Sequence, residues 1–348
     1  MKKLVLSSMA LAMLAGHAQA QSSVTLSGSI YGGLGLNSGG VKSNTAAAGT
    51  SSFMLSGKED IGGGSAVLFK VENGFNADTG AQANATTLFD KQAFIGLQGG
   101  WGTLRAGRVY TPAFATLALV ADPTGTYTVG TSTNIMESHG VRLNNGIIYN
   151  SPGFDPWTYA RRGFYGAAAH YFGESATGGS SRNSATGFNI GYGQGPLVVE
   201  LSTQKTNAYT SATQDIDTRS TLLAANYKFG DVRAYIAYSD NSARNIALNT
   251  KTKDNTDFLI GVVFPAGVGS VTAAYIRKDD NLPANNDAYQ IAASYDYPLS
   301  KRTKLTVGYA KIKNSNAANT YKVINGYAGT TATTAGTSSF TVGMTHRF

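Results

Sequence analysis

The chain contains no cysteine, and this absence removes several classes of structure at once. A disulfide framework, a thiolate metal site and a lipid-modified N-terminal cysteine are excluded. Proline is scarce, at 8 residues in 348. A membrane-spanning helix needs about 18 consecutive apolar residues. No stretch after residue 20 approaches that length. We therefore expect stability to come from packing and backbone pairing, without a helical anchor.

Residues 1–20 have the pattern of a secretory signal peptide. Two lysines precede an apolar run over residues 4–14, and alanines stand at the two positions where a signal peptidase requires small side chains. Cleavage there predicts a mature chain of 21–348. Loss of the two lysines lowers the formal net charge from +8 to +6, which fits an anion-attracting surface or simply a solvated exterior.

The abundant residues point to strands. Glycine reaches 42 residues and tyrosine 19, a composition typical of extended segments joined by polar turns. Apolar and polar residues alternate with period two in many segments, which predicts strands with one apolar face. Phe258 and Ile260, for example, alternate with Asp257 and Leu259. The apolar sets begin or end in Tyr or Phe, as an aromatic girdle at a membrane interface would.

Seven tight turns divide this pattern, and each predicts a hairpin. The predicted turns are 57–64, 98–102, 151–154, 193–196, 230–231, 265–269 and 298–302. With a lone first strand from Ser23 and a lone last strand ending at Phe348, seven hairpins make sixteen strands. Short turns on one side and long polar loops on the other favour an all-β, sixteen-stranded antiparallel transmembrane β-barrel, whose closure leaves no unpaired edge in lipid.

A soluble β-sandwich would show the same alternation, but its interior must be filled with apolar side chains. Here the opposite face is polar: Lys70 and Glu72 alternate with Val67, Phe69 and Val71, so we expect both charges on the pore wall. They pair with each other or with loop residues in this interpretation, which makes a structural role more natural than a selective one.

Residues 110–141 form the longest stretch without a strand pattern. Loops of this length in a compact structure usually carry function. We expect this segment to fold into the lumen and narrow it, with Tyr110 and Tyr127 either lining the constriction or packing the loop. The last strand alternates up to a terminal aromatic, Phe348, which we interpret as the signal for outer-membrane assembly.

Several motifs together resemble the trimeric general (non-specific) porins of Gram-negative bacteria, in their beta-proteobacterial branch. The matching motifs, in chain order, are Ser23-Val24-Thr25-Leu26, Gly57-Lys58-Glu59-Asp60-Ile61-Gly62, Phe69-Lys70-Val71-Glu72-Asn73-Gly74-Phe75, Gln92-Ala93-Phe94-Ile95-Gly96-Leu97, Gly107-Arg108, Tyr149-Asn150-Ser151-Pro152 and Gly343-Met344-Thr345-His346-Arg347-Phe348. The resemblance implies a homotrimer of water-filled pores in outer-membrane lipid and lipopolysaccharide. Each pore would pass small hydrophilic solutes and ions and be narrowed by its third outer loop.

The resemblance also implies opposed rows of charge at the constriction, since such charges decide which ions pass. The basic row would be Lys91, Arg105, Arg108 and Arg142, and the acidic row, on the loop, Asp122 and Glu137. Lys91 and Arg108 fit solvated positions at the rim equally well. Two departures from the family pattern, Ser52 and Ile148 where arginine is usual, subtract positive charge from the wall.

Other functions remain open or are disfavoured. A solute-selective outer-membrane channel, and a non-channel barrel or adhesin, are the alternatives to a general diffusion pore. An enzyme is not expected. Of the three histidines after residue 20, only His346 is predicted to face outward. It would lie near the periplasmic edge, where no serine hydrolase site would form. No cofactor, metal or nucleic-acid partner is predicted, although acidic pairs such as Asp279 and Asp280 offer oxygen ligands for Ca²⁺.

Overall fold

The computed structural model describes residues 23–39, 43–44, 51–125, 128–137, 140–173, 182–316, 320–323 and 336–348. The predicted signal peptide and Tyr127 lie outside the described residues. In the described part of the chain, no helix is long and apolar enough to cross a membrane.

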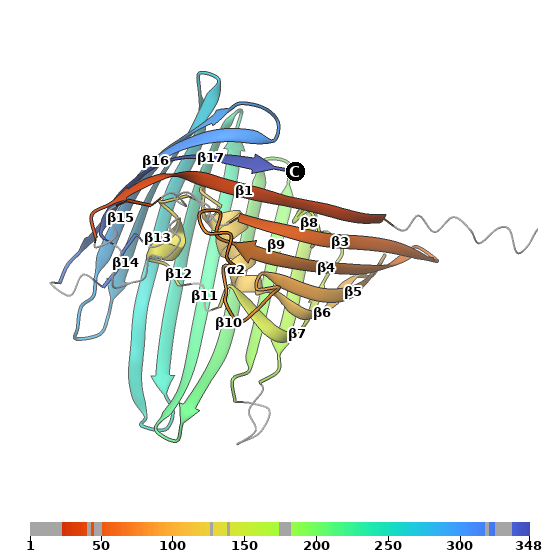
Figure 1. The fold of residues 1–348 in the computed structure, drawn as a ribbon. Helices are drawn as coiled ribbons and strands as arrows, with labels where there is room; N and C mark the ends of the chain where they lie inside the picture. The colour runs from red at the N-terminus through yellow and green to blue at the C-terminus, as the bar shows by residue number, and fades with distance from the viewer. Residues whose placement is uncertain are drawn as a thin grey trace, which may run out of the picture.

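One antiparallel sheet contains sixteen long strands and one two-residue strand (Figure 1). The first eight long strands and the short one are β1 (Ser23–Asn37), β2 (Ser43–Asn44), β3 (Ser51–Gly62), β4 (Ser65–Phe75), β5 (Gln92–Gly99), β6 (Gly102–Tyr110), β7 (Arg142–Asn150), β8 (Gly163–Tyr171) and β9 (Ala185–Gln194). The remaining eight are β10 (Leu197–Ser211), β11 (Gln214–Phe229), β12 (Val232–Asn245), β13 (Thr250–Ala266), β14 (Gly269–Asp280), β15 (Ala288–Pro298), β16 (Thr303–Asn314) and β17 (Ser338–Arg347). Strand β1 pairs with both β3 and β17, so the sheet closes into a barrel.

The outer and inner faces of the barrel follow the predicted alternation. On β13, Phe258 and Ile260 are exposed while Asp257 and Leu259 are buried. On β10, Leu201 is exposed between the buried Glu200 and Ser202. The exposed set is apolar and the buried set is largely polar, which is the pattern of a barrel that meets lipid outside and water inside. The prediction of a sixteen-stranded antiparallel barrel is therefore confirmed.

The hairpin turns differ in detail from the sequence prediction. Six of the seven have two to four residues between strands, and β3 continues to Gly62, so the predicted turn 57–64 was too long. Gly63 and Gly64 form this turn with positive φ angles of 62° and 74°, which glycine adopts without steric cost. The predicted turn 151–154 was too short, because the β7–β8 connection extends over residues 151–162.

The connection between β6 and β7 contains short helical segments. These are α2 (Pro112–Thr116), the π-helical turn η1 (Leu117–Ala121) and the 3-10 turn η2 (Ser132–Asn134). Thr111 caps α2 by accepting a hydrogen bond from the Phe114 backbone N–H at 3.1 Å, and Pro112 occupies the first turn, where its missing N–H costs nothing. We call residues 111–141 the long loop.

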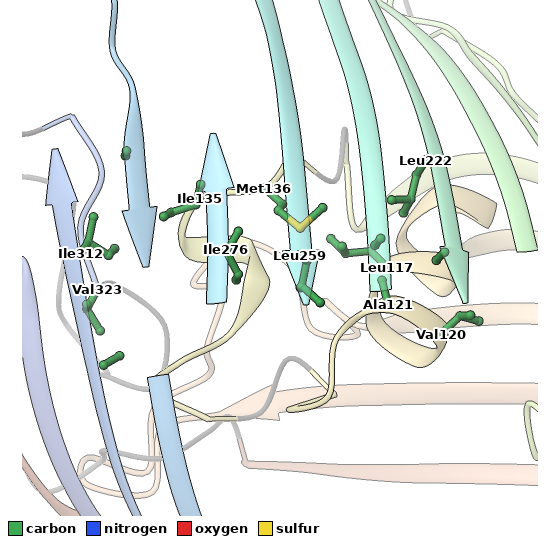
Figure 2. Packing of buried hydrophobic residues seen from close by; sticks show 14 of the residues in the cluster. Leu117, Val120, Ala121, Ile135, Met136, Leu222, Leu259, Ile276, Ile312 and Val323 are labelled. Atoms are coloured by element: carbon green, nitrogen blue, oxygen red, sulfur yellow. The ribbon is translucent and has the colours of Figure 1, made fainter. Parts of the chain in front are cut away.

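The long loop packs against side chains on the buried face of β11 to β16. Figure 2 shows Leu117, Val120 and Ala121 of the loop beside Leu222 and Leu259, with Ile135 and Met136 near Ile276. Each fully buried aliphatic side chain contributes about 1.5–3 kcal/mol, so this apolar cluster contributes substantially to holding the loop. The inner face is thus not uniformly polar: one apolar part of it lies under the loop.

Candidate functional site

Five cationic side chains come together on four neighbouring strands of the wall. Lys70 lies on β4, Lys91 directly before β5, Arg105 and Arg108 on β6, and Arg142 at the start of β7. We call them the cationic cluster. No ion pair found in the described part of the chain involves any of the five. Their charges are therefore not cancelled by direct contact with carboxylates.

Lys70 and Glu72 lie on the inner face of β4, with exposed fractions of only 5% and 7%. They do not form an ion pair with each other. Glu72 accepts hydrogen bonds from the Ser52 hydroxyl at 3.1 Å and from the Gln92 amide at 3.0 Å. Lys70 instead places its Nζ 4.9 Å from the ring centroid of Trp157, a cation–π contact. Neutral partners thus hold both groups.

Arg105 is almost fully buried on the inner face of β6. Its Nη2 donates to the Asn150 side-chain oxygen at 3.0 Å, and its guanidinium carbon lies 5.2 Å from the Phe94 ring centroid. Ile148, which pairs with Arg105 across the β6–β7 ladder, is also on the inner face. The arginine that the family pattern places at position 148 is therefore missing from the pore wall itself.

A β-bulge between Gly107 and Val109 redirects Arg108. Its Nε donates to the Asp90 carbonyl at 2.7 Å and its Nη1 to Asn144 Oδ1 at 2.6 Å. Gly107 has a φ of 133°, and an added Cβ there would lie 2.2 Å from the Ala93 carbonyl oxygen. Only glycine fits this bend, so the Gly107-Arg108 pair fixes where the guanidinium points.

Lys91 and Arg142 lie nearest the start of the long loop. Arg142 holds its guanidinium 5.0 Å from the Tyr110 ring centroid, and Tyr110 stacks on Phe114 of α2 with centroids 5.3 Å apart. Lys91 is buried, and its backbone N–H donates to the Glu72 carbonyl at 3.2 Å. Burial lowers the pKa of the Lys91 ammonium, and the nearby Glu72 carboxylate opposes that shift.

The two acidic residues predicted to oppose this cluster have other partners. Asp122 organises the loop, accepting hydrogen bonds from the backbone N–H groups of Thr124 at 2.8 Å and Ser132 at 2.7 Å. Glu137 forms an ion pair with Lys253 of β13 at 2.6 Å. Both therefore have partners in the loop or on β13, and no ion pair found among the described residues joins either of them to the cationic cluster.

Comparison with known proteins decides the family. A family model described as Gram-negative porin matches residues 7–317, which is most of the chain. Outer membrane porin protein 32 of Delftia acidovorans is 30% identical, over 97% of this chain and 98% of its own length. This chain is a Gram-negative porin. It forms a channel in the outer membrane through which small hydrophilic solutes and ions diffuse passively.

Solved structures give the same answer for the fold of this porin. An anion-selective porin from Comamonas acidovorans superimposes with a TM-score of 0.80 and 27% identity, covering 94% of this chain and 100% of that one. OmpT of Vibrio cholerae, in a structure described as its trimer form, matches with a TM-score of 0.68 at 14% identity, over 94% of this chain and 99% of that one. The second likeness shows the shared barrel only.

The porin also contains a buried site that the sequence analysis missed. Glu200 of β10 is fully buried and accepts four hydrogen bonds, two on each carboxylate oxygen. The donors are Thr116 of α2 at 2.5 Å, Asn189 at 2.8 Å, Arg161 at 2.8 Å and Tyr165 at 2.6 Å. The alternation of Glu200 with Leu201 indicated an inward carboxylate, but nothing in the sequence indicated its partners.

A second anchor holds the far part of the long loop. Gln290 of β15 is fully buried, and its amide nitrogen donates to the carbonyl of Gly130 at 2.8 Å. Its amide oxygen accepts a hydrogen bond from Asn134 at 2.9 Å. Glu200 on β10 and Gln290 on β15 therefore fix the loop at two points. Both strands lie outside the segment β4 to β7 that carries the cationic cluster.

Proposed function

We propose that this porin prefers anions and that the cationic cluster is the determinant. The long loop, in this proposal, forms the constriction, and the permeating ion passes between it and the strands β4 to β7. The supporting observation is that five cations gather on this wall, and that the side chains of four of them, Lys70, Arg105, Arg108 and Arg142, have neutral hydrogen-bond acceptors or aromatic rings as partners. Unpaired charge in a narrow, partly dry passage acts strongly on a passing ion, because the effective dielectric constant is low there.

The solved anion-selective porin from Comamonas acidovorans supports the same preference. The missing arginines at positions 52 and 148 argue that the preference is weaker than a fully basic wall would give. Ser52 lies on the inner face and donates to Glu72, so a cation has been replaced by a neutral hydroxyl beside a carboxylate. We therefore place the selectivity in the five residues that remain.

Reversal potentials across a planar bilayer in a potassium chloride gradient test this proposal. Arg142→Ala should shift the reversal potential toward that of a cation-permeable pore, because it removes one charge from a cluster of five. Arg142→Lys should retain most of the original value. Arg302→Ala is the matched control, since Arg302 is exposed at the β15–β16 turn. An equal shift for Arg142→Ala and Arg302→Ala would show that the cluster does not set the selectivity.

We also propose that three copies of the porin assemble in the outer membrane, among lipid and lipopolysaccharide. The trimer form of the Vibrio cholerae protein supports this state. Strand β1 offers a continuous apolar outer face, with Val24 and Leu26 exposed by 65% and 63%. Electrophoresis of unheated protein in mild detergent, against a heated sample, measures the assembled mass; migration as a single folded chain would contradict the trimer.

A further inference from the structure

The β7–β8 turn is unlike the other turns on its side of the barrel. It has twelve residues, 151–162, where the other six hairpin turns have two to four. It folds into a small hairpin of its own: Phe154 bridges to Arg161, and the Asp155 N–H donates to the Ala160 carbonyl at 3.0 Å. The Asp155 carboxylate accepts hydrogen bonds from the Trp157 N–H at 2.8 Å and the Thr158 hydroxyl at 2.7 Å. We call this segment the inner turn.

The inner turn packs on the inward-facing side chains of the wall. Phe154 is 7% exposed and its ring centroid lies 6.0 Å from that of Tyr165, which is buried on the inner face of β8. The neighbouring Phe164 points the other way and is 80% exposed. Trp157 packs against a second apolar cluster on the inner face, made of Phe94, Val109, Ile148, Ala167, Ala169, Tyr171 and Ala185.

The inner turn is also tied to the long loop. Arg161 Nε lies 2.8 Å from Glu200 Oε2, with side-chain exposed fractions of 6% and 0%, and its Nη2 donates to the Ala115 carbonyl of α2 at 3.4 Å. Because Thr116 of the same helix donates to Glu200, one buried carboxylate joins both segments to the wall. Separating the two members of a charge pair that is so enclosed is strongly unfavourable, so the ion pair holds the inner turn in place.

We infer that the inner turn forms a second narrowing of the pore, on the short-turn side of the long loop, and that Trp157 sets its width. The Trp157 ring lies 4.9 Å from Lys70 Nζ, so an anion that leaves the cationic cluster toward this side passes the indole. The indole of Trp157 occupies space that a two-residue turn would leave to water. This inference rests on the channel function and is independent of which residues set the ion preference.

Fluorescence quenching tests the location of the indole. The chain has two tryptophans, and the second, Trp101, is 47% exposed at the β5–β6 turn and stacks on the outward-facing Tyr149 at 6.3 Å. In lipid vesicles, the variant Trp101→Phe reports Trp157 alone and Trp157→Phe reports Trp101 alone. We expect iodide to quench Trp157 and bromine-labelled phospholipids to quench Trp101. Quenching of Trp157 by the brominated lipid, with no effect of iodide, would overturn the inference.

Single-channel conductance tests the width. Trp157→Ala should raise the conductance in simple salt and admit larger neutral sugars, while Trp101→Ala, which removes the same volume outside the barrel, should change neither. The number of charges in the cationic cluster is unchanged, so the reversal potential should move less than it does for Arg142→Ala, and this separates the inference from the role of the cluster. Heat-modifiable migration checks that each variant folds. If Trp157→Ala folds poorly, Trp157→Leu serves instead; unchanged conductance in a folded variant would refute the second narrowing.

Discussion

Replacement of Glu200 by glutamine should loosen the long loop without emptying any volume. The carboxylate is fully buried, and each of its oxygens accepts two hydrogen bonds. An amide of the same shape keeps one oxygen and turns the other into a nitrogen that donates. Two of the four donors then face a group that cannot accept from them.

The magnitude follows from those two bonds. If the amide nitrogen faces Arg161 and Tyr165, two hydrogen bonds to a charged carboxylate oxygen are lost, each worth about 1.5–3 kcal/mol. The sum is about 3–6 kcal/mol. Arg161 keeps its contacts to the carbonyls of Tyr159 and Ala115, which argues for the lower half of that range. The alternative amide orientation breaks the bonds to Thr116 and Asn189 and releases α2 directly.

Urea unfolding of the barrel in lipid vesicles measures this loss, and single-channel recording should show larger current fluctuations as α2 detaches. Asp231→Asn is the matched control, because the same chemical change is made on a side chain that is 86% exposed. Arg161→Met combined with Glu200→Gln should cost less than the sum of the two single changes, as expected for direct partners. Equal unfolding free energies for Glu200→Gln and Asp231→Asn would refute the reasoning.

Two further changes probe the pairing inside the wall and the closure of the barrel. Lys278→Met should lower the free energy of unfolding by about 3–5 kcal/mol, because Lys278 and Asp257 are both fully buried and their charged atoms lie 2.6 Å apart. Adding Asp257→Asn should recover part of this loss, which urea unfolding measures. Deletion of Phe348 should lower the amount of heat-modifiable barrel in outer-membrane fractions, because the Phe348 and Gly28 backbones exchange two hydrogen bonds of 3.1 Å at the seam. A normal yield of folded barrel after this deletion would contradict a role in assembly.

The architecture was predictable because the signals that specify a barrel are local. The period-two alternation of Phe258 and Ile260 with Asp257 marks which face meets lipid, and glycine-rich pairs such as Gly63-Gly64 mark where strands reverse. Once the strands are counted, the requirement that no edge stays open in lipid leaves one topology. Boundaries were less accurate, since a twisted hairpin continues pairing through polar residues near its turn.

The site was only partly predictable, because it depends on contacts between residues far apart in sequence. The alternation indicated that Lys70 and Glu72 face inward, yet their partners, Trp157 and the side chains of Ser52 and Gln92, come from other strands and from the inner turn. The sequence predicts a complete turn at Ser151-Pro152-Gly153-Phe154, which is only the first third of the inner turn. Its remaining residues have no periodic pattern, and only the packing of Trp157 on the wall shows where they lie.

The way the long loop is held explains how the cationic cluster keeps its charge. A loop anchored by carboxylates on β4 to β7 would neutralise the groups that we propose act on ions. Here the loop is anchored on the strands that follow, by the apolar side chains around Leu259, by the amide of Gln290 and by Glu200, whose charge is already matched by Arg161. Glu137 follows the same pattern, because it forms an ion pair with Lys253 of β13. The inner wall is thus divided into a part that binds the loop and a part whose cations form no ion pair with the described residues of the loop. Changes to the anchors should therefore alter the fluctuations of the single-channel current, and changes to the cluster should alter the ion preference.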